Sequence, residues 1–375
     1  MPSLKFLHTA DVHIGSANGY LGHLASRRQR ETVATFRRMA QHCETNSIPL
    51  MLIAGDLFDS NKIDTSLVSE VFGIFSEYSS VKFVFAAGNH DPLSSDSPFL
   101  NEKLPENVFV LSTDNDCLFL EDLNAKIYGR SFKSVFEGAF EGFNANIAKD
   151  SFNIAVLHGE LMNSASDYRF IDIAKIEASG MDYVALGHVH LTSPVKKAGN
   201  TAYAYSGCPE GQGFDELGEK GALEIQITDG VLKSKFIPFA IRQHLLCRID
   251  ISGAVTTEMV ISKVIRHLKE NYGEDFSNNL YKIELIGKLP ADFTLQIHSV
   301  LAGLSSLLFF VKLKNSTEKE FNYALIAKEH TLRGIFVKKM LSRIDAANGH
   351  EVELLKKALS LGLNAFESEV DYDEN

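Results

Sequence analysis

Five short apolar segments in the first half of the chain are each followed at once by side chains that can bind a metal ion. In chain order, these side chains belong to Asp11, His13, Asp56, Asn89, His158, His188 and His190. The set holds carboxylates, imidazoles and one amide but no thiolate, and this selection favours manganese- or iron-like ions over structural zinc. One such residue after a strand is usually a turn or cap residue. The coincidence of five strand ends makes a shared metal site the better interpretation.

Ligands of these types are suited to the hydrolysis of phosphate esters. A carboxylate can bridge two divalent ions about 3.5–4 Å apart and hold a hydroxide between them, in line for attack on phosphorus. The pattern therefore predicts a hydrolase that uses two metal ions.

The elements that must position these side chains are predicted to alternate between strands and helices. The apolar segments indicate strands over residues 4–9, 50–54, 82–86, 153–157 and 183–186, with helices over 27–43 and 66–78. This alternation is typical of an α/β or layered α+β domain, here over residues 1–240. The carboxyl ends of strands border the ligand crevice of open α/β sheets, so the side chains should converge. Glycines beside four of the five strand ends would let the backbone turn sharply there.

Two further segments follow this domain. Residues 241–328 are predicted to form a small α/β domain, with strands around 247–251, 281–285 and 309–313 and helices around 260–268 and 293–304. Residues 329–375 are predicted to form two helices, 330–348 and 350–364, followed by an acidic tail. Each helix has an apolar stripe that the other helix covers only partly, so this segment should need a partner.

The composition is that of a globular protein. With 375 residues, of which 45% are hydrophobic, the chain can form two domains and an appendage. No run approaches the ~20 apolar residues of a membrane span, and the first residues lack the apolar stretch of a secretion signal. The four cysteines form no Cys-x-x-Cys pair, which disfavours structural zinc and disulfides. A reduced, cytoplasmic setting is therefore expected.

The net charge of −11 would by itself argue against a nucleic-acid substrate. However, five of the acidic residues lie in the last nine positions, with no basic residue among them. Two bound divalent cations would also offset negative charge in the active site. The charge therefore leaves a nucleic-acid substrate open.

The motifs around the candidate ligands resemble those of the calcineurin-like metallophosphoesterase superfamily. The matching series is Asp11-Val12-His13, Gly55-Asp56, Gly88-Asn89-His90-Asp91, His158-Gly159 and Gly187-His188-Val189-His190. Longer motifs at residues 8–15, 54–59 and 205–211 resemble the SbcD-type DNA repair exonucleases, the family of the nuclease subunit of the double-strand-break repair complex. The resemblance implies a β-sandwich flanked by helices over residues 1–240 and a DNA-facing capping domain over 241–328. It further implies that the C-terminal helices, within 329–375, dock onto an SbcC-type coiled-coil ATPase.

The resemblance also implies a role for each residue. One Mn²⁺ would be held by Asp11, His13, Asp56 and His190. The second ion would be held by Asp56, Asn89, His158 and His188. Fe²⁺ or Mg²⁺ are alternatives to Mn²⁺ for both ions. Asp56 would thus bridge the two ions. His90 would contact the scissile phosphate or act as the general acid, and Asp91 would either orient His90 or form a turn before Pro92.

Other features carry two interpretations each. The loop over residues 206–221 could shape the path of DNA or be an ordinary surface loop. The arginines of the first helix could contact phosphates, although a solvated face is the commoner explanation; they are Arg27, Arg28, Arg30, Arg37 and Arg38. His8 lies inside a strand and should be a core residue. His244, like the other histidines outside the motifs, is expected at the surface or partly buried.

Together these features predict a Mn²⁺-dependent DNA exonuclease or endonuclease that is homodimeric, cytoplasmic and associated with an SbcC-type ATPase. The alternative is a phosphatase or cyclic-nucleotide phosphodiesterase with the same metal site. Protein phosphatases of the superfamily carry Gly-Asp-x-x-Asp-Arg-Gly after the second strand, whereas this chain continues Asp59-Ser60-Asn61. A second alternative is an inactive scaffold, which the intact ligand set disfavours.

Overall fold

The computed structural model describes residues 3–112, 116–136, 140, 142–143, 147, 150–161 and 170–367. The chain divides into two compact units, Met1–His244 and Leu245–Asn375. No helix among the described residues is long and apolar enough to cross a membrane. The acidic tail expected at the C-terminus lies outside the described residues.

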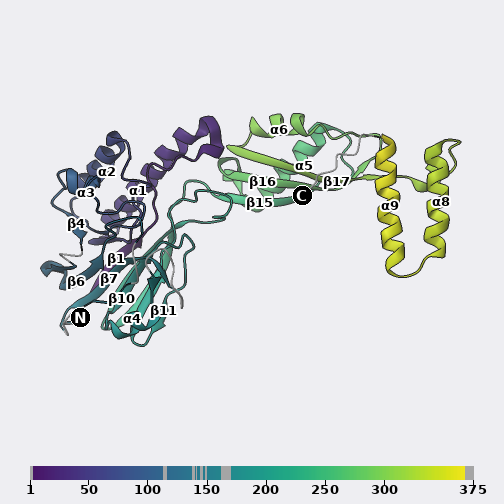
Figure 1. Ribbon diagram of the computed structural model, residues 1–375. Helices are drawn as coiled ribbons and strands as arrows, with labels where there is room; N and C mark the ends of the chain where they lie inside the picture. Colours follow the sequence, from purple (N-terminus) through teal and green to yellow (C-terminus); the bar gives the residue numbers. More distant parts are fainter. Residues whose placement is uncertain are drawn as a thin grey trace. The chain divides into compact units, whose positions relative to one another are not determined.

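The first unit contains two six-stranded sheets. The first sheet has the order β14-β13-β1-β2-β3-β4 and is seen with its helices in Figure 1. Its central strands run parallel from β1 to β4, while β13 and β14 are antiparallel additions. The strands are β1 (Ser3–Thr9), β2 (Leu50–Ile53), β3 (Lys82–Ala86), β4 (Val108–Leu111), β13 (Gly221–Thr228) and β14 (Val231–Pro238).

The second sheet has the order β11-β12-β10-β7-β6-β5. Strands β6, β7, β10 and β12 are parallel to one another, and β5 and β11 pair antiparallel at the two edges. The strands are β5 (Cys117–Leu120), β6 (Ala125–Arg130), β7 (Phe152–His158), β10 (Tyr183–Gly187), β11 (Lys196–Ala198) and β12 (Thr201–Tyr205). A two-stranded sheet joins β8 (Glu160–Leu161) to β9 (Phe170–Ile171).

Apolar side chains fill the space between the two sheets. Phe6 and Leu52 of the first sheet lie in one buried cluster with Ile154 and Tyr183 of the second. The outer face of the first sheet packs on α1 (Ala25–Thr45) and α2 (Thr65–Glu77), and that of the second packs on α4 (Ile173–Ala178). Strands covered on both faces are apolar throughout, as the burial of all four residues of β2 shows. This arrangement confirms the predicted sandwich flanked by helices.

Shorter helical segments complete the first unit. They are η1 (Gly19–Leu24), α3 (Pro98–Asn101) and η2 (Glu121–Leu123). The prediction missed the strands β4 to β6, β8, β9 and β11 to β14. The edge strand β14 shows why, because most of its side chains are exposed and no apolar run marks it.

The second unit begins with a three-stranded sheet of order β15-β16-β17. Helices α5 and α6 share a buried core with this sheet, to which Ile249, Val264, Ile283 and Val300 contribute. The elements are β15 (His244–Asp250), α5 (Thr257–Tyr272), η3 (Glu274–Asn278), β16 (Leu280–Pro290), α6 (Ile297–Ser305) and β17 (Phe310–Glu320). Strand β17 continues past the predicted end at residue 313, since its polar second half pairs with β16 through the backbone. Such pairing leaves no apolar pattern in the sequence.

A helical hairpin ends the described chain. After α7 (Tyr323–Ile326), helices α8 (Leu332–Ala346) and α9 (His350–Glu367) pack against each other. Their interface has its own apolar cluster, which includes Val337, Leu359 and Leu363 and is separate from the core of the three-stranded sheet. Part of each predicted apolar stripe is therefore used inside the hairpin.

Arg28 of α1 differs from both interpretations of the arginine-rich helix. Its side chain is only 2% exposed and donates hydrogen bonds to Glu31 and to Glu210 of the 206–221 loop. Arg242 pairs with the same Glu31 carboxylate at 2.7 Å. Arg28 thus belongs to a buried ion-pair network rather than to a solvated or phosphate-binding face.

We predict that Arg28→Ala lowers the free energy of unfolding of the first unit by about 3–5 kcal/mol. Removing one partner of a buried ion pair leaves an uncompensated charge in the interior. Arg30→Ala on the same helix is the matched control, because Arg30 is exposed and should change stability by less than about 0.5 kcal/mol. Urea denaturation would measure both, and equal effects of the two variants would contradict the burial argument.

Candidate metal centre

All seven predicted ligands lie at one edge of the sandwich. Asp11 and His13 follow β1, Asp56 follows β2, Asn89 follows β3, and His188 and His190 follow β10, while His158 is the last residue of β7. Strands β1, β2 and β3 are mutually parallel, as are β7 and β10. Both sheets therefore deliver their carboxyl ends to the same place, as predicted.

One group of potential ligands consists of Asp11, His13 and His190, whose ligand atoms all lie within 4.8 Å of one another. The Nε2 atoms of His13 and His190 are 3.2 Å apart. The Asp11 Oδ1 atom is 3.9 Å from His190 Nε2. A cation placed here would meet two nitrogen lone pairs and a carboxylate.

A second group surrounds His158. Its Nε2 atom is 3.0 Å from Asn89 Oδ1 and 3.3 Å from Asp56 Oδ2. The same Asp56 oxygen lies 3.8 Å from His13 Nε2 in the first group, and the His188 ring lies edge-on to that of His158, 5.2 Å away between ring centres. Asp56 is thus placed between the two groups, as a bridging carboxylate would have to be.

Three of the histidines are held by an oxygen atom on the far side of the ring. The Nδ1 atom of His158 lies 2.8 Å from the Ala54 carbonyl oxygen, that of His13 lies 3.1 Å from Asp59 Oδ1, and that of His190 lies 2.5 Å from Glu216 Oε1. A carbonyl or an ionised carboxylate only accepts, so each Nδ1 donates and the opposite ring nitrogen, Nε2, is the atom that faces the site. Metal-binding histidines are oriented in this way.

The backbone at the site is strained. Asp11, His13, Asp56 and His188 have φ angles of 53°, 50°, 52° and 97°, in a region that residues other than glycine rarely adopt. Backbone bonds from Asp11 to Gly55 and from His13 to Asp56 fix the first three, and the His188 amide donates to the Asp11 carboxylate. Strain of this kind concentrates at functional sites.

Two of the neighbouring glycines are required for steric reasons. A Cβ atom on Gly88 would lie 2.1 Å from Asp56 Oδ1, and one on Gly187 would lie 1.8 Å from the Ala54 carbonyl oxygen. Any side chain at these positions would displace Asp56 or the strand that carries it. The glycines therefore permit the close packing of the ligand-bearing loops.

The electrostatics of the cluster favour a cation. Burial opposes protonation of His158, but the Asp56 and Asp11 carboxylates outweigh it and raise its pKa to about 9. Burial likewise opposes protonation of His13, whose pKa is nonetheless raised to about 9 by Asp59, Asp56 and Asp11. Two buried carboxylates thus attract positive charge, which divalent ions would supply. Carboxylate oxygens, imidazole nitrogens and an amide oxygen form a donor set that fits such ions.

His90 lies at the rim of this cluster. Its side chain is 44% exposed, its Nδ1 atom is 3.0 Å from the Asp59 carbonyl oxygen, and its amide donates to Asp56. Its ligand atoms also come close to those of His13 and Asp56. His90 is therefore placed where it could meet both a substrate and the metal ligands.

Asp91 does not orient His90 as one of our two interpretations expected. Its buried carboxylate instead accepts hydrogen bonds from the backbone amides of Gly88, Asp56 and Phe58, at 2.8, 3.2 and 3.1 Å. Burial, followed by the charge of Asp56, raises the pKa of Asp91 to about 6. Asp91 thus holds two ligand-bearing loops together, which agrees with the turn interpretation.

Glu216 was not predicted as a site residue, and His244 is more deeply buried than predicted. Glu216 is one of several acidic residues in the 206–221 loop, and no local pattern distinguishes the one that reaches His190. His244 was expected near the surface but is 1% exposed, because its ring lies against Tyr20 and Phe214 and its Nε2 atom is 2.6 Å from the Tyr20 hydroxyl. His8 is a buried core residue, as predicted, and contacts the Tyr183 hydroxyl.

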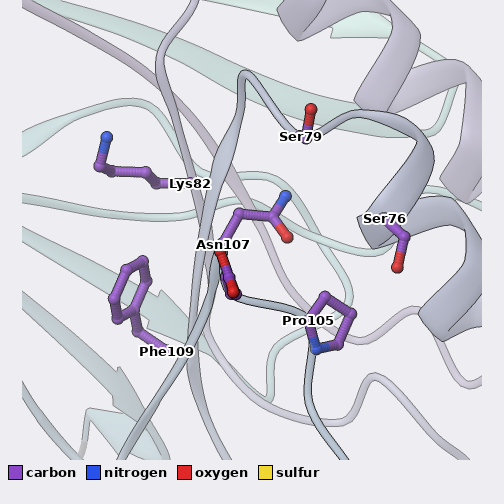
Figure 2. Close-up of a pocket in the computed structure, with 7 residues that line it drawn as sticks. Ser76, Ser79, Lys82, Pro105, Asn107 and Phe109 are labelled. Atoms are coloured by element: carbon purple, nitrogen blue, oxygen red, sulfur yellow. The ribbon is translucent and has the colours of Figure 1, made fainter.

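A hollow of about 450 Å³ lies elsewhere in the first unit and is shown in Figure 2. Its walls include Ser76, Lys82, Asn107 and Phe109. Lys82 begins β3, whereas the ligand Asn89 follows the other end of that strand. The Asn107 amide donates to three backbone carbonyls, so its role is structural. None of the residues that line this hollow is a candidate metal ligand.

A sandwich of two mixed sheets with carboxylates and histidines at the strand ends defines a metal-dependent phosphoesterase. The family model for calcineurin-like phosphoesterases matches residues 4–191, which is half of the chain. The chain therefore belongs to the calcineurin-like phosphoesterase family.

Several curated proteins are similar to the chain. The uncharacterized metallophosphoesterase YhaO of Bacillus subtilis is 30% identical over 260 residues, covering 63% of this chain and 60% of that protein. The DNA double-strand break repair protein Mre11 of Methanopyrus kandleri is 27% identical and covers 58% of this chain and 52% of that protein. A subunit of the nuclease SbcCD of Bacillus subtilis is 25% identical, with shares of 57% and 64%. The matches thus span less than two thirds of these relatives.

Solved structures show weaker similarity. The protein TT1561 of Thermus thermophilus is 10% identical, with a TM-score of 0.38, and covers 62% of this chain and 98% of that chain. The calcineurin-like phosphoesterase YfkN of Bacillus subtilis is 14% identical, with a TM-score of 0.35 and shares of 73% and 98%.

We predict that Asp56→Ala abolishes metal binding at both groups of ligands, reducing bound manganese by more than about 100-fold. The loss should be larger than the 10–100-fold that removal of an outer partner causes, because Asp56 itself lies between both groups. Metal analysis of the purified variant would measure it. Asp122→Ala is the control, since that carboxylate is 60% exposed and pairs with Lys82. Retention of manganese by Asp56→Ala would contradict the bridging position.

Proposed function

We propose that the protein is a Mn²⁺-dependent DNA nuclease that cleaves phosphodiester bonds at a site with two metal ions. The observation that carries the proposal is the position of Asp56 between two groups of ligands. Two similar proteins are named as a DNA double-strand break repair protein and as a subunit of a nuclease, which supports DNA as the substrate.

The residues would divide the work as follows. One ion would be held by Asp11, His13, Asp56 and His190, and the other by Asp56, Asn89, His158 and His188. Bound divalent ions supply a hydroxide at neutral pH and neutralise charge on the phosphate. His90, held through Nδ1 by the Asp59 carbonyl, would present Nε2 to the scissile phosphate and protonate the leaving oxygen.

The alternative proposal is a phosphatase or cyclic-nucleotide phosphodiesterase. One observation that keeps it open is the similarity to YhaO, whose name gives a phosphoesterase without a substrate. Hydrolysis of linear DNA with Mn²⁺ should be compared with hydrolysis of a cyclic nucleotide, a phosphomonoester and a chromogenic phosphodiester. The nuclease proposal requires DNA to be cleaved fastest, with loss of cleavage in Asp56→Ala. Preference for a small phosphoester would support the alternative.

We further propose that residues 241–328 form the DNA-facing domain and that the protein is a cytoplasmic homodimer. The hairpin of α8 and α9 would dock onto an SbcC-type coiled-coil ATPase. Leu355 and Leu359 belong to the predicted apolar stripe of α9 and are buried inside the hairpin, at 8% and 1% exposure. On α8, Leu332 and Ile335 are exposed at 77% and 53%, so these two residues would contact the partner.

His90→Ala is expected to keep both metal ions and to lose about 10²–10⁴-fold in kcat on DNA, the usual contribution of a general acid. The metals should remain because the other ligands are intact. Parallel measurement of bound manganese and single-turnover cleavage would test this, with the exposed His23→Ala variant as the control. If His90→Ala loses its manganese, His90 is a metal ligand and its assigned role is wrong.

The double variant Leu332→Glu/Ile335→Glu is expected to weaken ATPase binding by about 30-fold, about 2 kcal/mol, because it would leave two charges without partners in an apolar interface. Nuclease activity alone should be unchanged. Co-purification and a binding titration with the ATPase would measure the effect, with Lys338→Glu on the same helix as the control. Unchanged binding, or an insoluble product after removal of residues 328–375, would argue that the hairpin serves the fold.

A further inference from the structure

We infer that Glu216 is a positioning residue for the metal centre, whose carboxylate fixes the His190 ring so that its Nε2 atom faces the ions. The inference rests on the proposed metal centre, although not on DNA as the substrate. It assigns the 206–221 loop a function different from either of those expected from the sequence.

Both oxygens of the Glu216 carboxylate are engaged. Oε1 lies 2.5 Å from His190 Nδ1, and Oε2 accepts a hydrogen bond from the Gln212 amide at 2.7 Å. The Cys208 thiol also donates to Oε2, at 3.5 Å. A carboxylate held at both ends cannot rotate freely, so the direction of its bond to His190 is fixed.

His190 needs this support more than the other anchored histidines. Its side chain is 29% exposed, whereas those of His13 and His158 are 5% and 0% exposed. Neighbouring groups enclose the two buried rings, and His158 is held by a backbone carbonyl that no substitution removes. The His190 ring is less enclosed, so its position depends on the hydrogen bond to Glu216. A charged partner on Nδ1 also increases the basicity of Nε2 toward a metal ion.

The loop that carries Glu216 is itself anchored. Glu210, in the same loop, is fully buried and accepts hydrogen bonds from Arg28, Thr35 and the Ile241 amide, at 2.9, 2.6 and 2.6 Å. The Lys220 ammonium donates to the His190 carbonyl oxygen at 3.2 Å. The buried ion pair between Arg28 and Glu210 thus helps to position the loop that carries the Glu216 carboxylate. An ordinary surface loop would not require such an anchor.

The test is a calorimetric titration of Mn²⁺ into the full-length wild-type protein and the variants Glu216→Ala, Glu216→Gln and Glu219→Gln. Glu216→Ala should weaken Mn²⁺ binding by about 10–100-fold, the effect of losing an outer partner of a metal ligand. Glu216→Gln keeps an accepting oxygen without the charge and should lose less. Glu219 is exposed in the same loop, so Glu219→Gln should bind as the wild type does.

The outcomes separate this inference from the proposed function. If the wild type binds no Mn²⁺, the proposed metal centre fails, and the inference fails with it. If the wild type binds Mn²⁺, and both Glu216→Ala and Glu216→Gln bind it as tightly as the wild type does, only the inference is overturned. Circular dichroism would check folding, and Glu216→Gln, which preserves the shape of the side chain, decides the matter if Glu216→Ala does not fold. A loss in Glu219→Gln as large as that in the Glu216 variants would also overturn it.

Discussion

The burial of two carboxylates beside each other is the constraint on which the first unit depends. Asp11 and Asp56 are 0% and 2% exposed, and a buried anion is costly unless a positive charge or hydrogen-bond donors compensate it. Burial raises the pKa of Asp11, while the surrounding histidines lower that of Asp56 in spite of its burial. Protonated histidines therefore compensate the negative charge of Asp11 and Asp56 only in part. Divalent ions would compensate the rest and stabilise the fold by binding to the native state.

The two packed sheets bring the groups that can compensate this buried charge to the ends of short strands. The first sheet supplies both carboxylates, His13 and Asn89, and the second supplies His158, His188 and His190, so ligands face each other across the interface. The strained backbone of Asp11, His13 and Asp56 is held by bonds between the loops that follow β1 and β2. Asp91 adds three bonds from its own loop. The strained residues of the site are therefore held in place by hydrogen bonds between neighbouring loops.

The features that could be predicted from the sequence are those determined by a few consecutive residues. A strand followed by Asp-x-His or by Gly-Asp is visible in a few residues, and parallel strands place their ends together. Pairings across long distances leave no such trace. Glu216 reaches His190 over 26 positions, and Arg28 reaches Glu210 over 182. The sequence showed an arginine-rich helix and an acidic loop, but which arginine meets which acid depends on the packing of the whole unit.

The 206–221 loop acquires its importance from where it lies in the topology. It connects β12 in the second sheet to β13 in the first, so it is the segment by which the chain returns to the first sheet. A carboxylate on this segment can hold His190, which follows β10 of the second sheet, while Glu210 is bound to α1 on the outer face of the first. The loop thereby links α1 to one histidine of the metal centre through hydrogen bonds. A connection of this kind explains why a surface-like sequence is buried at Cys208 and Glu210, and why the carboxylates of Glu210 and Glu216 bind partners inside the protein.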